Sequence, residues 1–336
     1  MKSRKTLSAA ALGLSVLAGC GARSELDNGN FQETQTPQEP HDPPVETPDN
    51  VQLLTRRMLA EELVGDVMKL EGECVLSFPD VSVNDSLCYP AHVLHTLDAD
   101  NGFPDGTFKP DEYVLRAEAW KVASRALGLI GHDSVCLDEI EDASYDDWYG
   151  AYVGAFCRNG LPVLKEPGKV EPGEVMTVEE FDELKETLTA HFFDRPLARY
   201  DLMDLAVSSF LNVNVVDVDG CEPVYVDVDP NSVECVTTNM MFDAGYIGEL
   251  PDGEFRGTDY LNHAEMSKFF SLLGGIEPVA SGCSGADQST WYADYMDGLC
   301  EDGYLPEGWA TDPGAMADFF VTSQTAWQMD LDSYDF

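Results

Sequence analysis

A long-range repetition of cysteine and charged residues constrains the fold of this chain more than any other sequence feature. Six residues recur at a constant spacing of 147 positions. They are Cys74, Asp80, Cys88, Arg116, Glu118 and Cys136, matched in order by Cys221, Asp227, Cys235, His263, Glu265 and Cys283. Trp148 and Cys157 recur 143 positions later as Trp291 and Cys300. Chance rarely produces such a series, so the sequence predicts two equivalent halves.

Within each half, turn residues separate short apolar segments. The loop between residues 103 and 112 is so rich in Pro, Asp and Gly that no regular element can cross it. The segment that follows has apolar residues three to four positions apart, namely Leu115, Ala119, Val122, Ala126 and Ile130. This spacing predicts a helix with one buried face. We therefore expect an all-α fold of helix–loop–helix repeats in two halves, residues 51–194 and 195–336.

The order of these elements resembles the S-layer homology (SLH) repeat, a helix–loop–helix module that tethers proteins to bacterial cell-wall polymers. The resemblance rests on a Phe-x-Asp-Val turn at Phe78, the loop Pro-Asp-Gly-Thr-Phe-Lys-Pro at 104–110, and the helix start Leu-Arg-Ala-Glu at 115–118. It implies a duplicated SLH-like fold and a non-catalytic role in attachment.

The resemblance also implies a ligand groove lined by arginines. In the family, an arginine near the start of the second helix lies in a groove between repeats and meets the acidic cell-wall glycan. Arg56, Arg116 and Arg199 occupy this position. The corresponding residues Val178, His263 and Met316 depart from the pattern. The alternative for the three arginines is a surface salt bridge to one of the 62 acidic residues.

Two tryptophans and two glycines complete the residues that the resemblance assigns to the groove. Trp148 and Trp291 match an aromatic residue that can stack on a sugar ring, but both also fit an apolar helical stripe, which favours core packing. Gly106 and Gly253 suit a tight turn, and they would also let a ligand approach the backbone.

The acidic residues near the helix starts do not indicate an enzyme. Glu118, Glu180 and Glu265 each lie three residues after a helix-opening position, and Thr177 and Asn262 precede two of them, which is the pattern of a capping box. The chain contains no HExxH, GxSxG or phosphate-loop motif. We expect no catalytic residue and no cofactor.

The cysteine count predicts disulfide bonds. Nine cysteines are present, and if Cys20 is lipidated an even number remains, as expected in an exported chain. Because equivalent halves should pair alike, we predict the bonds Cys74–Cys88, Cys136–Cys157, Cys221–Cys235 and Cys283–Cys300. No CxxC pair exists, which argues against a zinc site.

The N-terminus predicts export and lipidation. Basic residues precede an apolar run that ends in Leu-Ala-Gly-Cys at 17–20, which resembles a bacterial lipobox. Residues 1–19 would be a signal peptide, and Cys20 would carry the lipid. An ordinary signal peptide is the alternative. Because Gly21 rather than Asp follows, the outer membrane is the expected location in a Gram-negative cell. Residues 20–50 are polar and proline-rich, which predicts a disordered tether.

The formal net charge of −43 bears on partners rather than on fold. Nucleic acid and anionic lipid would repel such a chain. Two acidic strings, at 98–100 and 217–229, lack the ligand order of an EF-hand, although weak Ca²⁺ binding is compatible with them. The function predicted is an envelope lipoprotein that binds a cell-wall polysaccharide or a peptidoglycan-linked polymer. The alternative is a protein-interaction scaffold that has lost glycan binding.

Overall fold

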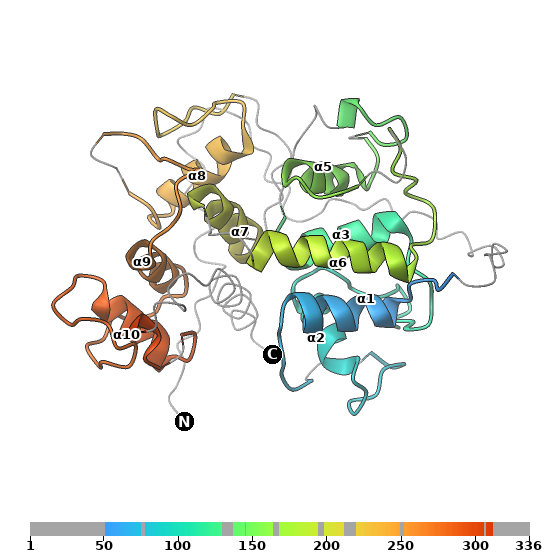
Figure 1. Cartoon of the computed structure of the whole chain (residues 1–336), viewed down its shortest axis with the longest axis horizontal. Helices are drawn as coiled ribbons and strands as arrows, with labels where there is room; N and C mark the ends of the chain where they lie inside the picture. The colour runs from blue at the N-terminus through green and yellow to red at the C-terminus, as the bar shows by residue number, and fades with distance from the viewer. Residues whose placement is uncertain are drawn as a thin grey trace. The chain divides into compact units, whose positions relative to one another are not determined.

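The computed structural model describes residues 51–74, 78–129, 137–144, 146–163, 168–193, 198–211, 220–248, 252–305 and 307–311. The predicted signal peptide, Cys20, the tether, Cys136 and Met316 lie outside these ranges. Within them the regular elements are helices, joined by isolated β-bridges rather than by a sheet (Figure 1). The predicted all-α class is confirmed.

The described residues form two compact units that divide at residue 190. The first unit contains α1 (Arg56–Glu62), the π-helical η3 (Leu63–Val67), α2 (Cys88–Thr96), α3 (Arg116–Leu127), α5 (Gly150–Arg158) and most of α6 (Val178–Phe193). The second unit contains α7 (Arg199–Leu211), α8 (Val233–Asp243), α9 (His263–Leu273), α10 (Ala293–Glu301) and the 3-10 turn η4 (Trp309–Thr311).

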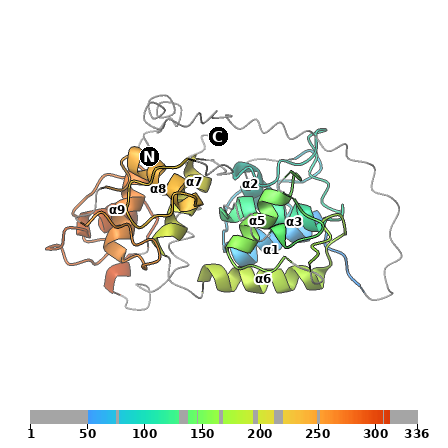
Figure 2. The same cartoon turned by 90° about the horizontal axis from the view of Figure 1, so that it is seen from above.

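Helices pack in consecutive pairs within each unit, with α5 against α3 and α8 against α7 (Figure 2), and with α2 against α1 and α10 against α9 (Figure 1). The second helix of one repeat therefore buries the first helix of the next. No helix in the described part of the chain combines the length and apolar character needed to cross a bilayer.

A closed ring of backbone hydrogen bonds lies at the centre of the first unit. Leu54 donates its N–H to the carbonyl of Met176, Met176 donates to Val114, and Val114 donates back to Leu54, at 2.9, 2.9 and 3.0 Å. All three side chains are at most 3% exposed. The segments that precede α1, α3 and α6 thus meet around one buried point, which sets the positions of the three helix starts.

The predicted capping glutamates close these helix starts. Each accepts the backbone N–H of the residue three positions earlier, at 2.9 Å for Glu118, 2.8 Å for Glu180 and 3.3 Å for Glu265. The Thr177 hydroxyl and the Asn262 amide oxygen accept the reciprocal N–H bonds of a capping box. These carboxylates are structural, as the sequence indicated.

The described residues contain the disulfides Cys74–Cys88, Cys221–Cys235 and Cys283–Cys300, with Cα–Cα distances of 5.6, 6.2 and 5.9 Å. Cys157 is also disulfide-bonded, and its predicted partner Cys136 lies outside the described residues. In the chain-entropy account, a disulfide that closes a loop of this length stabilises the fold by about 3 kcal/mol.

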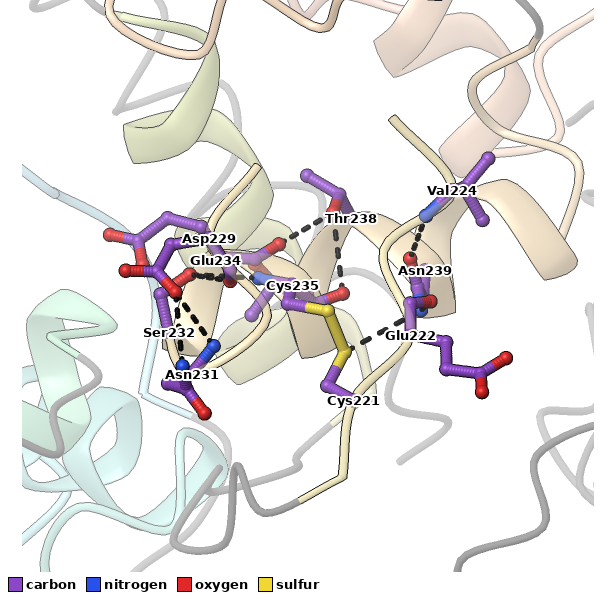
Figure 3. Close-up of a disulfide and its surroundings, with 11 residues drawn as sticks. Cys221, Glu222, Val224, Asp229, Asn231, Ser232, Glu234, Cys235, Thr238 and Asn239 are labelled. Carbon is purple, nitrogen blue, oxygen red and sulfur yellow. Dashed lines mark hydrogen bonds between the residues drawn. A yellow bond between two sulfur atoms is a disulfide. The ribbon is translucent and has the colours of Figure 1, made fainter. Parts of the chain in front are cut away.

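Polar contacts fix the chain around the second of these bonds. Figure 3 shows the Asn239 side chain of α8 beside the disulfide, where it accepts from the Val224 N–H at 3.1 Å and donates to the Glu222 carbonyl at 2.8 Å. Ser232 caps α8 by accepting the N–H of Cys235 at 3.3 Å. The bond and its neighbours therefore hold the turn preceding Asp227 against α8.

Candidate ligand-binding site

One aspartate holds each of the three described loops by the same contact. The carboxylate of Asp80, Asp142 or Asp227 accepts two consecutive backbone N–H groups that lie 28 and 29 residues later. The donors are Phe108 and Lys109, Val170 and Glu171, and Phe255 and Arg256, at distances between 2.7 and 2.9 Å. The loops therefore have one geometry despite their different sequences.

The second donor of each pair has a left-handed backbone. Its φ is 53° at Lys109, 48° at Glu171 and 55° at Arg256. A residue other than glycine in this region costs roughly 1 kcal/mol. Hydrogen bonds to a charged acceptor contribute about 1.5–3 kcal/mol each, so the two bonds to the aspartate offset this cost.

Arg56, at the start of α1, lies against the first of these loops. Its Nε donates to the Phe108 carbonyl at 2.7 Å, and one Nη donates to the Asp100 carboxylate at 2.8 Å. The guanidinium lies 4.9 Å from the centroid of the Phe103 ring and 4.7 Å from that of Phe108. The side chain is 11% exposed, so it connects α1 to the loop from a mostly buried position.

Arg116, at the start of α3, contacts the next loop in a similar way. It donates to the Glu171 carbonyl at 3.3 Å, to the Glu171 carboxylate at 2.9 Å and to the Glu180 carboxylate at 2.8 Å. The side chain is 10% exposed, and its Nε has no partner within the described part of the chain. Glu180 therefore serves both α6, as its cap, and this arginine.

Arg199, at the start of α7, repeats the arrangement in the second unit. It donates to the Phe255 carbonyl at 2.8 Å and to the Glu265 carboxylate at 2.5 Å, with 17% of its side chain exposed. All three predicted groove arginines are thus paired internally, in ion pairs more buried than the surface salt bridges considered above. A ligand anion that contacted them would have to displace an internal carboxylate.

The two tryptophans differ in exposure. Trp291 is 61% exposed and precedes α10 by two residues, so the core-packing interpretation is wrong for this residue. Its ring lies 5.7 Å from that of Tyr292 and 6.4 Å from that of Tyr295. Trp148 also precedes its helix, α5, but it is half-buried and its ring is 5.6 Å from that of Tyr149.

The two glycines have the backbone conformation that a turn requires. φ is 81° at Gly106 and 75° at Gly253, in the region that glycine tolerates best. A Cβ added at Gly106 would meet no atom within 4 Å, and one at Gly253 would meet only the Val226 side chain, at 3.8 Å. The turn role is confirmed, and the space beside both residues is open.

Other sequence candidates are occupied by structural contacts. Asp98 pairs with Arg125, and Asp100 pairs with Arg56. Among the described residues, no three His, Cys, Asp or Glu side chains gather in a metal-binding arrangement. His92 of α2 is buried, and burial followed by the nearby charge of His95 lowers its pKa.

Comparison with known proteins identifies the module that contains the first loop. Residues 91–119 match the S-layer homology domain family. They lie within the stretch 78–129 on which the predicted resemblance rests, and the match confirms an SLH domain there.

A more distant likeness extends over a larger part of the chain. Cell surface glycoprotein 1 of Acetivibrio thermocellus is 23% identical over 211 residues, which cover 61% of this chain and 8% of that protein. The likeness therefore concerns a small part of a much longer protein.

Proposed function

We propose that this protein is a non-catalytic cell-envelope protein that binds a cell-wall polysaccharide or a peptidoglycan-linked polymer through its SLH-like modules. The observation that carries the proposal is the SLH match at residues 91–119, which includes the loop fixed by Asp80. The likeness to a cell surface glycoprotein supports the same location in the cell envelope.

The proposal assigns the polymer to the aspartate-held loops and the aromatic residues beside the helix starts. Of the two tryptophans, Trp291 offers the more exposed ring for stacking on a sugar, and Trp148 offers a partly covered one. The open space at Gly106 and Gly253 leaves the loop backbone approachable. The arginines Arg56, Arg116 and Arg199 would shape this surface by joining each helix start to the following loop.

We further propose that Cys20 carries a lipid that anchors the chain in the outer membrane, with residues 21–50 as the tether. The sequence Leu-Ala-Gly-Cys at 17–20 and the polar composition of residues 21–50 support this part of the proposal. Metabolic labelling with a fatty-acid probe tests it. The native chain should take up the probe, and Cys20→Ser should take up none.

The polymer-binding proposal is tested by co-sedimentation. The Cys20→Ser chain, which cannot be lipidated, is mixed with sacculi from the native organism, before and after their attached polymers are removed. Binding that disappears with the polymers is the expected result. Binding that survives removal of the polymers would indicate that the ligand is peptidoglycan itself. Absence of binding to both preparations would contradict the proposed function.

A second candidate function is a protein-interaction scaffold built on the same fold. The internal pairing of all three helix-start arginines favours it, as does the net charge of −43, which repels an anionic polymer. The same experiment separates the candidates, because a scaffold should bind neither preparation of sacculi.

A further inference from the structure

An anionic wall polymer needs a cation that it can reach, and the three helix-start arginines are largely covered. Between 10 and 17% of each of their side chains is exposed, and each is already paired with a carboxylate. The second backbone donor of each aspartate-held loop lies beside the proposed binding surface, and this residue is Lys109, Glu171 or Arg256.

Lys109 has an ammonium group held by an aromatic ring. Its Nζ lies 3.8 Å from the centroid of the Phe103 ring, in the range of a cation–π contact. The side chain is partly exposed and forms no salt bridge within the described ranges, and its charge contributes, after the hydrogen bonds with Thr107, to the lowered pKa of the exposed Asp105. An ammonium group has three N–H donors, so contact with one ring face leaves donors for an oxygen of a ligand.

The surroundings of Lys109 are fixed. Asp80 accepts its backbone N–H at 2.7 Å, its backbone is in the αL conformation, and its Nζ lies over the Phe103 ring. The same ring contacts the guanidinium of Arg56, which is tied to Asp100. The ring and the ammonium group are therefore preorganised, which lowers the entropy lost when a ligand binds.

The other two loops offer no equivalent in the described residues. Glu171 is acidic and accepts from Arg116. Arg256 is paired with both Asp252 and Glu254, so its charge is already neutralised. Lys169 is exposed in the second loop, but no described aromatic ring holds it.

We infer that Lys109, held on Phe103, is the residue that contacts a carboxylate or phosphate group of the wall polymer, and that this loop is the anion-binding one among the three described. The inference rests on the proposed function and makes it more specific. It predicts that one of the three loops dominates binding and that the ligand is an acidic rather than a neutral glycan.

The test uses the full Cys20→Ser chain and polymer-bearing native sacculi, with binding measured by co-sedimentation over a range of protein concentrations. Lys109→Ala should weaken binding by about tenfold, the effect expected for losing a hydrogen bond between charged groups. Lys109→Arg should retain most of the binding because it keeps the charge. Lys169→Ala and Arg256→Ala are matched controls in the other two loops, and both should bind like the parent chain.

The outcomes separate this inference from the proposed function. If the parent chain binds and Lys109→Ala binds equally well, the inference is wrong and the proposed function stands. If Lys169→Ala or Arg256→Ala weakens binding as much as Lys109→Ala does, the assignment to one loop is also wrong. Absence of binding by the parent chain would overturn the proposed function and this inference together. Unchanged thermal unfolding of Lys109→Ala would establish that a lost signal is not due to misfolding.

Discussion

The starts of α1 and α7 share one backbone arrangement but are secured by different side chains. The N–H of Arg57 donates to the Pro110 carbonyl at 3.0 Å, and that of Tyr200 donates to the Gly257 carbonyl at 2.9 Å. Arg57 then reaches Asp85 with two hydrogen bonds, at 2.6 and 3.0 Å. Tyr200 instead packs its ring against Gly257, where a Cβ would lie 2.1 Å from the ring.

This difference shows that the loop geometry does not depend on one kind of side-chain contact. The aspartate contact is common to both loops, whereas the residue after the helix-start arginine contributes an ion pair in one unit and aromatic packing in the other. The ion pair should respond to pH and salt, and the packed ring should respond to changes in volume.

The largest expected effect comes from removing the contact that the two loops share. Asp80→Ala and Asp227→Ala each remove both acceptors of two backbone N–H groups, and each should lower the free energy of unfolding by about 3 kcal/mol. Hydrogen exchange followed peptide by peptide would measure this loss separately in each unit. Asp80→Asn and Asp227→Asn, which keep one acceptor, should lose about half as much. A large loss in only one unit would contradict the equivalence.

A smaller loss of stability is expected from placing a methyl group where the Tyr200 ring packs against Gly257. Gly257→Ala forces the new methyl group into the ring, which should destabilise the second unit by about 2 kcal/mol. The double variant Gly257→Ala with Tyr200→Ala should recover part of this loss, as measured by thermal unfolding. If Gly257→Ala alone leaves the unfolding temperature unchanged, the ring does not hold this helix start.

The ion pair at α1 should contribute less and should depend on pH. Its hydrogen bond with Arg57 lowers the pKa of Asp85 from 3.8 to about 2. Because the folded-state pKa is depressed, the stabilisation is present above pH 4 and is lost as the pH falls through 2. Both side chains are about 30% exposed, so Arg57→Ala should cost less than about 1 kcal/mol at pH 7. Urea unfolding at pH 7 and pH 2 measures this difference, most of which should be lost at the lower pH.

The smallest effect is expected at the hydroxyl group of Tyr200. Burial, followed by the charges of Asp227 and neighbouring acids, raises the pKa of Tyr200 to about 12. Tyr200→Phe keeps the ring and should change the free energy of unfolding by less than about 0.5 kcal/mol at pH 7. Because the folded-state pKa is raised, the parent chain should lose stability between pH 10 and 12, and the variant should lose less. A large loss at pH 7 would mean that the hydroxyl group, not the ring, secures α7.

Local sequence patterns predicted the parts of this structure that depend on nearby residues. The capping residues Thr177 and Asn262, the turn glycines and the helical class follow from spacings of a few positions. Asp201, which accepts the N–H of Ala198 at 2.9 Å, is the same kind of cap at α7, and the capping-box pattern does not predict it because Asp stands where the pattern has Glu.

The candidate site depended on contacts that no local pattern contains. Arg116 and Glu180 are 64 residues apart, so the internal pairing of the arginine was not visible in the sequence. A helical period predicts a buried position for Trp291, but α10 begins two residues after it, so that period does not apply there. The constant spacing of 28 residues from Asp80 to Phe108, and from Asp227 to Phe255, was a usable signal for the loop contact.

The ring formed by Leu54, Val114 and Met176 has a consequence for how the first unit can unfold and evolve. An open stack of repeats has terminal members that can fray or be lost one at a time. Here the hydrogen bond from Leu54 to Met176 joins the two ends of the series, so no repeat is terminal. Removing any one of the three segments would open the ring and expose the other two, so this unit should be gained or lost as a set of three.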